Sequence, residues 1–135
     1  MAGAVRPKVV WSKVICKQPG NYIGWPSVAR AISGDLMVVF SGDRESHFCP
    51  YGKTKLIRSV DEGDTWSGVE TINNTPLDDR DAGVLVLRSG TVVVSWFTGA
   101  TWMSIEGRRE RIGNAVADAW ERHCGKIPEE TRRQW

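Results

Sequence analysis

The sequence predicts an all-β fold of four-stranded antiparallel sheets, interrupted by one helical segment near residues 105–124. Three observations support this prediction. A turn motif occupies residues 59–66, two Ser-Gly pairs each separate two β-prone apolar runs, and a four-residue apolar period begins only after residue 105. With 135 residues, the chain is long enough to bury the core of one domain.

The turn motif has the form Ser-x-Asp-x-Gly-x-Thr-Trp, which is called an Asp-box. We expect a hairpin turn here, because Asp61 can accept hydrogen bonds from backbone N–H groups and Gly63 tolerates a conformation that penalises a side chain. The Trp66 ring can pack against the strands of its own sheet. The motif residues are therefore predicted to be structural, between strands near 53–59 and 66–72: Ser59, Asp61, Gly63, Thr65 and Trp66.

Two hairpins of the chain resemble each other. The runs 26–32 and 35–41 flank Ser33-Gly34, and the runs 83–88 and 91–97 flank Ser89-Gly90. With the two glycines aligned, SVARAISGDLMVVF and GVLVLRSGTVVVSW match without a gap. The two glycines are 56 residues apart, and this spacing is typical of the four-stranded blades of a β-propeller. Blade one would span about 22–72, and a partial blade two would span about 81–135. A β-sandwich would also give Ser-Gly hairpins, but it would not predict the Asp-box turn.

Two other segments carry weaker patterns. The run 9–16 (VVWSKVIC) is β-rich, whereas Ile112, Val116 and Trp120 recur every four residues as in a helix. Gly125 and Pro128 are stop signals for that helix. We interpret the helix as an insertion after the second strand of blade two. We expect the whole chain, 1–135, to be an N-terminal piece of a longer propeller that has no turnover alone.

Composition excludes several classes of function. Charged residues are 25% of the chain and the net charge is +2, so we expect no nucleic-acid partner. No apolar run approaches the ~20 residues of a membrane span, so no membrane partner is expected. Residues 1–8 lack the apolar core of a signal peptide, which predicts a cytoplasmic location, with a periplasmic or secreted form left open. Cys16, Cys49 and Cys124 are too widely spaced for a zinc site, so free thiols, no metal and no cofactor are expected.

These features together resemble the sialidase superfamily, whose members are six-bladed propellers with Asp-box (BNR) repeats. The resemblance covers roughly residues 21–98, and the Asp-box and the blade order carry it. In this family the first inner strand often begins with a Tyr-Arg-Ile-Pro type motif, and the matching stretch here is Tyr22-Ile23-Gly24-Trp25-Pro26. Gly24 stands where the family has its first carboxylate-binding arginine, and glycine cannot supply a guanidinium fork.

The resemblance implies that the loop after the first hairpin reaches the active-site face. On that basis Asp43 and His47 are candidate catalytic residues, and Arg44 is a candidate substrate-binding residue, able together to bind and protonate a glycosidic oxygen. The alternative is a polar loop in which Arg44 pairs locally with Asp43 or Glu45.

A second cluster, Asp78-Asp79-Arg80-Asp81, precedes the next inner strand. By the same resemblance, Arg80 would bind a substrate carboxylate or hydroxyl, and Asp81 would be a catalytic residue that orients the substrate or acts as a base. The alternative is a capped turn, since Asp favours turns. Trp25 could stack on a sugar face at this end or belong to the core.

The resemblance implies an exo-acting, sialidase-like glycoside hydrolase with a terminal, acidic sugar as its carbohydrate substrate. Sialidases use a tyrosine nucleophile, and neither Tyr22 nor Tyr51 matches its position. The alternative is a non-catalytic propeller that binds glycans or proteins with the same face, and a lyase on the same fold is a third possibility. The oligomeric state is not predicted.

Overall fold

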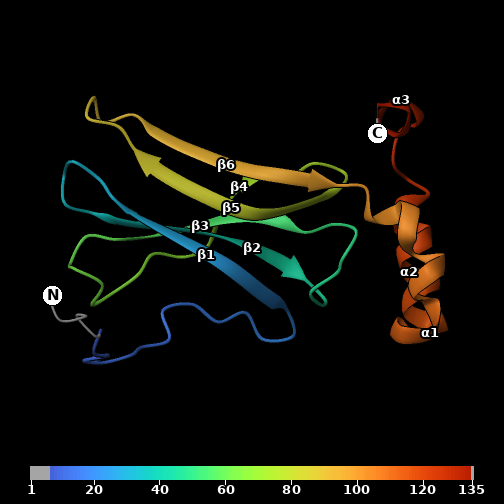
Figure 1. Ribbon diagram of the computed structural model, residues 1–135, viewed down its shortest axis with the longest axis horizontal. Helices are drawn as coiled ribbons and strands as arrows, with labels where there is room; N and C mark the ends of the chain where they lie inside the picture. Colours follow the sequence, from blue (N-terminus) through green and yellow to red (C-terminus); the bar gives the residue numbers. More distant parts are fainter. Residues whose placement is uncertain (1–6, 135) are drawn as a thin grey trace, which may run out of the picture.

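Two antiparallel sheets make up most of the computed structural model, which describes residues 7–134 (Figure 1). The four-stranded sheet follows chain order: β1 (Tyr22–Arg30), β2 (Leu36–Arg44), β3 (Lys53–Ser59) and β4 (Glu70–Asn73). The two-stranded sheet pairs β5 (Asp78–Val86) with β6 (Val92–Gly99). The predicted β-rich character and both Ser-Gly hairpins are confirmed. Gly34 and Gly90 have φ values of 99° and 87°, which glycine adopts without a steric penalty.

Both hairpins contain the same irregularity. The segment Gly24–Ser27 of β1 has one residue more than the part of β2 that it pairs with, and the segment Arg80–Gly83 of β5 has one more than its partner in β6. Each is a β-bulge, and the bulges put Trp25 and Asp81 at the same φ of 53°. Because non-glycine residues rarely adopt this conformation, the two hairpins share a specific backbone feature as well as an apolar pattern.

The four-stranded sheet buries side chains on both faces. One face packs against the two-stranded sheet through Met37, Val39, Leu56, Ala82 and Val84. The opposite face carries Ile23, Val38, Phe40 and Ile57 and is covered by Ile15, Cys16 and Trp66. Strands covered on both faces explain the near-continuous apolar sequence of β2.

The N-terminal segment does not form the strand that its β-rich run 9–16 suggests. It crosses the sheet as irregular chain, held by Ile15 and Cys16 in the core and by a hydrogen bond of 2.5 Å from Lys13 Nζ to the Asp64 carbonyl. β-prone residues form a strand only where a neighbouring strand pairs with them. The described residues exclude 1–6 and Trp135. Most of the segment 1–8, which lacks the apolar core of a signal peptide, therefore lies outside them.

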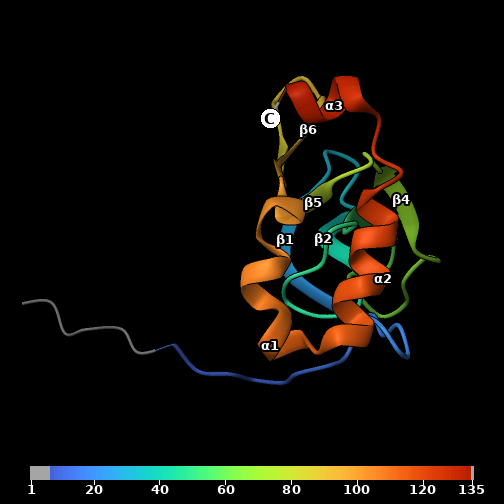
Figure 2. The same cartoon turned by 90° about the vertical axis from the view of Figure 1, so that its right-hand side faces the viewer.

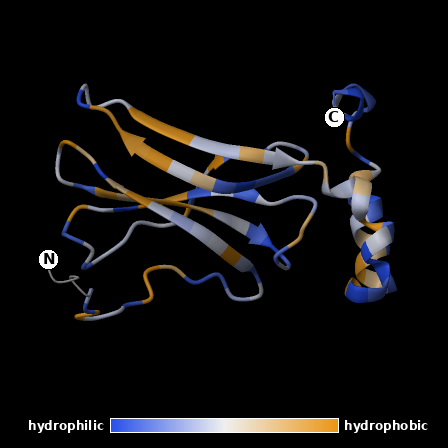
Figure 3. Cartoon of the chain, in the orientation of Figure 1, coloured by the Kyte–Doolittle hydropathy of each residue, from blue (hydrophilic) through white to orange (hydrophobic). Residues whose placement is uncertain are grey.

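The outer side of the two-stranded sheet is exposed and apolar. Leu85, Val93 and Phe97 are 57%, 44% and 50% exposed, and apolar residues recur along both β5 and β6 (Figure 3). Within the described residues, β6 pairs with β5 alone.

The helices gather at one end of the sheets, where α1 and α2 stand side by side (Figure 2). Two short 3-10 turns, Thr101–Ser104 and Glu106–Arg108, lead into α1 (Arg109–Ile112), α2 (Asn114–Cys124) and α3 (Glu129–Arg133). The single helix expected over 105–124 is wrong, because Gly113 at φ 84° breaks it. The predicted stop at Gly125 is confirmed. None of the described helices is long and apolar enough to cross a bilayer.

The helices have their own core. Trp120, Ala117 and Cys124 of α2 are buried, the first two completely, and they pack with three residues outside the helix: Leu77, Ile105 and Ile127. This core fixes α2 against the loop that follows β2, because the indole Nε1 of Trp120 donates a 2.7 Å hydrogen bond to Glu45 Oε2.

The Asp-box forms the predicted turn between β3 and β4. The Asp61 carboxylate accepts hydrogen bonds of 2.8 Å from the Ser59 hydroxyl and from the Thr65 backbone N–H. Gly63 has φ 94°, and the Trp66 indole donates a 3.0 Å hydrogen bond to its carbonyl. The structural role predicted for these residues is confirmed, although β4 begins at Glu70, later than expected.

A buried ion pair joins the two sheets at the end opposite the Asp-box, where the helices lie. Arg44, the last residue of β2, forks onto the carboxylate of Asp78, the first residue of β5, and both side chains are 0% exposed. The distance from Nη2 to Oδ2 is 3.2 Å. The backbone of Gly52 passes so close that an added Cβ would overlap the guanidinium and lie 2.7 Å from Asp78 Oδ1. Glycine is therefore required beside this pair.

Replacement of Asp61 by Asn should remove an acid-sensitive part of the stability. Hydrogen bonds from the Thr65 hydroxyl, the Thr65 N–H and Ser59 lower the pKa of Asp61 from 3.8 to about 2. A lowered folded-state pKa stabilises the fold above the unfolded pKa, and this stabilisation is lost as the pH falls from about 4 to about 2. Urea unfolding of the chain and of Asp61→Asn should therefore differ at pH 7 and converge near pH 2. Asp64→Asn, in the same turn, is the control, and an equal pH dependence of both variants would refute the assignment.

Replacement of Arg44 by Leu should destabilise the fold by about 3–5 kcal/mol, because Asp78 is left as an uncompensated buried charge. The double variant Arg44→Leu/Asp78→Leu should recover much of this loss. The matched control is Arg30→Gln, which removes a bidentate but exposed pair with Glu62 and should cost far less. Urea unfolding measures all three variants, and equal losses for Arg44→Leu and Arg30→Gln would contradict the interpretation.

Candidate functional site

Four strand ends meet where the helices stand. β1 and β5 begin there, and β2 and β6 end there (Figure 1). The predicted candidates Trp25, Arg80 and Asp81 lie within the strands, since β1 and β5 start several residues earlier than expected. The local backbone thus positions these side chains more firmly than a loop would.

Trp25 is the centre of the candidate site. Its ring centroid lies 4.9 Å from that of His47 and 5.7 Å from that of Tyr22. The guanidinium carbon of Arg80 lies 4.9 Å from the same ring, and that of Arg44 lies 5.3 Å from it. The structure therefore brings Trp25, Arg44, His47 and Arg80 close together. The left-handed backbone at the bulge turns Trp25 towards this group.

The Arg80 guanidinium is almost buried and incompletely paired. Its side chain is 11% exposed, and its nearest carboxylates are Asp78 at 3.6 Å and Asp81 at 3.9 Å. Its Nε makes no hydrogen bond to the described residues. Besides Trp25, the aromatic rings of Phe48 and Phe97 lie near the guanidinium, at 5.5 and 5.6 Å. Such a group retains capacity for an anion at the surface of the site.

Arg44 has a different role from the one predicted. Its side chain is completely buried and bound to Asp78, so it supports the site from beneath and does not reach a ligand. Neither local pairing that was considered, with Asp43 or with Glu45, forms. Arg44 Nη2 donates instead to the His47 carbonyl at 3.0 Å, which fixes the start of the 45–51 loop.

Asp43 lies on the opposite face of the sheet from this group. Its carboxylate is 2.6 Å from Lys55 Nζ and 3.4 Å from Lys53 Nζ, and it accepts a hydrogen bond from Gln18 of the N-terminal segment. Burial raises the pKa of Asp43, but the hydrogen bonds and charges of Lys55 and Lys53 more than offset that effect, so its pKa is lowered. An ionised, doubly paired carboxylate is a poor proton donor, so the structure separates Asp43 from the other catalytic candidates.

His47 and Asp81 are both accessible. The His47 residue is exposed, and its ring contacts that of Trp25 at a tilted angle of 56°. The Asp81 carboxylate is 40% exposed, and its backbone N–H donates to Ser41 Oγ at 3.0 Å, which ties the bulge of β5 to the first sheet. The neighbouring Asp79 is buried and accepts hydrogen bonds from Thr75 and Thr98, so it is a structural residue.

Sequence reasoning missed Phe48 and Arg108. Phe48 directly follows His47, and three guanidiniums lie over its ring: Arg80 at 5.5 Å, Arg108 at 3.8 Å and Arg111 at 5.3 Å. The i, i+3 spacing of Arg108 and Arg111, which places side chains on one side of a helical turn, was the available signal.

The cysteines are free thiols, as expected. Cys49 and Cys124 are buried and Cys16 is partly buried. Burial raises the pKa of Cys124 to about 11, so its thiol stays protonated at neutral pH. The described residues contain no cluster of three or more metal-binding side chains.

Comparison with known proteins identifies no relative of this chain. No family model, no curated protein and no solved structure matches the chain.

Proposed function

We propose that the end of the sheets around Trp25 and Arg80 binds a terminal acidic sugar, and that the chain contributes blades to a sialidase-like β-propeller glycoside hydrolase. Three features support the propeller part of the proposal. The four strands follow chain order, the bulge recurs in the second hairpin, and the Asp-box forms its hydrogen-bonded turn between β3 and β4. In the sialidase-like families the Asp-box and the sugar site lie at opposite ends of the blades, as the Asp-box and Trp25 do here.

The observation that carries the binding part is the state of Arg80. Its guanidinium is held against Trp25, is nearly buried and has no carboxylate closer than 3.6 Å among the described residues. An arginine in this state can donate parallel hydrogen bonds to a carboxylate. The Trp25 ring beside it offers an apolar face for the sugar ring. A carboxylate and a pyranose face would therefore meet matching groups in one place.

A non-catalytic glycan-binding role is the second candidate function. It is favoured by Asp43, which is ion-paired on the far face of the sheet. Of the three catalytic candidates, only His47 and Asp81 remain at the Trp25 end. A hydrolase would therefore need His47 or Asp81 to transfer a proton to or from the substrate.

Binding should discriminate between acidic and neutral sugars. We expect sialyllactose to bind with an affinity at least tenfold higher than that of lactose, which lacks the carboxylate, in a titration followed by calorimetry. Arg80→Gln should abolish this difference, because a charge-assisted hydrogen bond contributes roughly 1.5–3 kcal/mol. Arg30→Gln, at the other end of the sheets, is the control and should leave binding unchanged. Equal affinities for the two sugars, or an unaffected Arg80→Gln variant, would refute the proposal.

Turnover by the chain would favour the hydrolase over the glycan-binding role, whereas its absence is expected for both. We expect no release of 4-methylumbelliferone from its sialoside by the 135-residue chain, because Asp43 is unavailable as an acid. If hydrolysis is observed, Asp81→Asn and His47→Gln should each abolish it while sialyllactose binding persists. Hydrolysis that survives both substitutions would show that neither residue is catalytic.

A further inference from the structure

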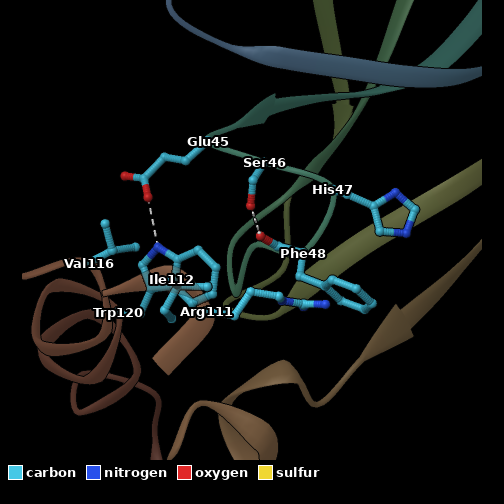
Figure 4. Close-up of a pocket in the computed structure, with 8 residues that line it drawn as sticks. All are labelled: Glu45, Ser46, His47, Phe48, Arg111, Ile112, Val116 and Trp120. Carbon is cyan, nitrogen blue, oxygen red and sulfur yellow. Dashed lines mark hydrogen bonds between the residues drawn. The ribbon is translucent and has the colours of Figure 1, made fainter. Parts of the chain in front are cut away.

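We propose that the cleft between the 45–48 loop and helices α1 and α2 is a second binding site, which takes a small amphipathic anion with one carboxylate on a flat apolar body. The cleft has a volume of 440 Å³ and is lined on one side by Glu45–Phe48 and on the other by Arg111, Ile112, Val116 and Trp120 (Figure 4). This volume lies within the range of small-molecule sites.

The floor and walls of the cleft are largely apolar. Ile112, Val116 and Trp120 are spaced four residues apart and form one side of the cleft, although Gly113 interrupts the helix between the first two. Phe48 adds an aromatic ring from the loop, next to Arg111 (Figure 4). A flat apolar molecule would therefore contact aliphatic and aromatic surface in the cleft.

The charged groups of the cleft are arranged asymmetrically. The Glu45 carboxylate accepts hydrogen bonds from Trp120 Nε1 and from the Tyr51 hydroxyl, so at that end it serves to hold the helix. The guanidinium of Arg111 lies at the other end, beside Phe48 (Figure 4). The carboxylate of a ligand is thus favoured at the Arg111 end and repelled at the Glu45 end.

The arginines at the Phe48 end are available for an anion. Arg109, between them in sequence, is fully engaged by Glu106, Asp118 and Glu121 on another side of the turn. Arg108 and Arg111 make no ion pair with any described carboxylate, and Arg108 donates only its Nε, to Ser104 Oγ at 3.0 Å. Two guanidiniums that lie within 6 Å of the same ring centroid and have no carboxylate partner add positive charge to this end of the cleft. A bound anion would be attracted to that charge.

This site is distinct from the sugar site. The imidazole of His47, which belongs to the Trp25 group, contacts the edge of the Phe48 ring, with 4.8 Å between the centroids, and lies away from Ile112, Val116 and Trp120 (Figure 4). Phe48 is shared, since Arg80 also lies over its ring. The inference does not depend on the proposed sugar binding, and substitutions can separate the two.

The probe is 2-naphthoate, and 2-naphthylmethanol is its neutral counterpart, each titrated by calorimetry into the full chain. We expect saturable binding of 2-naphthoate with an affinity roughly tenfold higher than that of the alcohol, and a roughly tenfold loss in Arg111→Gln. Val116→Trp, which fills the cleft from a partly exposed position, should abolish binding of both compounds. Arg122→Gln, on an exposed side of α2, is the matched control and should bind as the unmodified chain does.

The competing outcomes are distinguishable. Equal affinity for acid and alcohol, or an unaffected Arg111→Gln variant, would overturn the assignment of an anion site, and absence of saturable binding would overturn the site itself. Arg80→Gln should abolish sialyllactose binding and leave 2-naphthoate binding within twofold. Loss of 2-naphthoate binding in Arg80→Gln, with retention in Arg111→Gln, would mean that the probe occupies the sugar site instead. Circular dichroism of each variant verifies that the fold is intact.

Discussion

The Arg44–Asp78 pair determines where the two sheets meet, and the residues around Trp25 depend on that position. Arg44 ends β2 and Asp78 begins β5, so their contact aligns the strand ends from which Trp25, Arg80 and Asp81 project. Both members of the pair also make hydrogen bonds outside the sheets. Arg44 donates to the His47 carbonyl, and Asp78 accepts from the hydroxyl of Thr101, which leads into the helices. Desolvating two charges is costly, and the fork geometry together with these extra hydrogen bonds offsets that cost. One buried contact therefore connects both sheets, the site loop and the helical segment.

Local patterns in the sequence predicted the parts of the fold that local interactions determine. The Asp-box turn forms because its donors and acceptors all lie within eight residues, and the Ser-Gly hairpins form because Gly34 and Gly90 supply positive φ values. The bulges could not be predicted, since Trp25 and Asp81 carry no conformational signal that would mark them. The strand suggested by run 9–16 is absent because strand formation depends on a pairing partner that the segment does not have.

The candidate site was predicted in part for the same reason. The order of the hairpins determines which strand ends converge, and the convergence of those ends predicts that Trp25, His47 and Arg80 lie close together. The partners of Arg44 and Asp43 do not follow from sequence, because Asp78 is 34 residues from Arg44 and Lys55 is 12 from Asp43. Charge pairs at such separations depend on which face of a strand each side chain occupies, and the extra residue of a bulge changes that face. Asp43, itself at φ 53°, illustrates this.

The exposed strip on β5 and β6 bears on how the molecule behaves in concentrated solution. The edge of β6 that no described strand pairs with lies next to apolar side chains such as Val93 and Phe97, and it offers both backbone hydrogen bonds and buried area to a second molecule. Long-range repulsion opposes such encounters only weakly, since the net charge is +2. Self-association and loss of solubility should therefore begin at this strip, and added salt, which screens the remaining repulsion, promotes both.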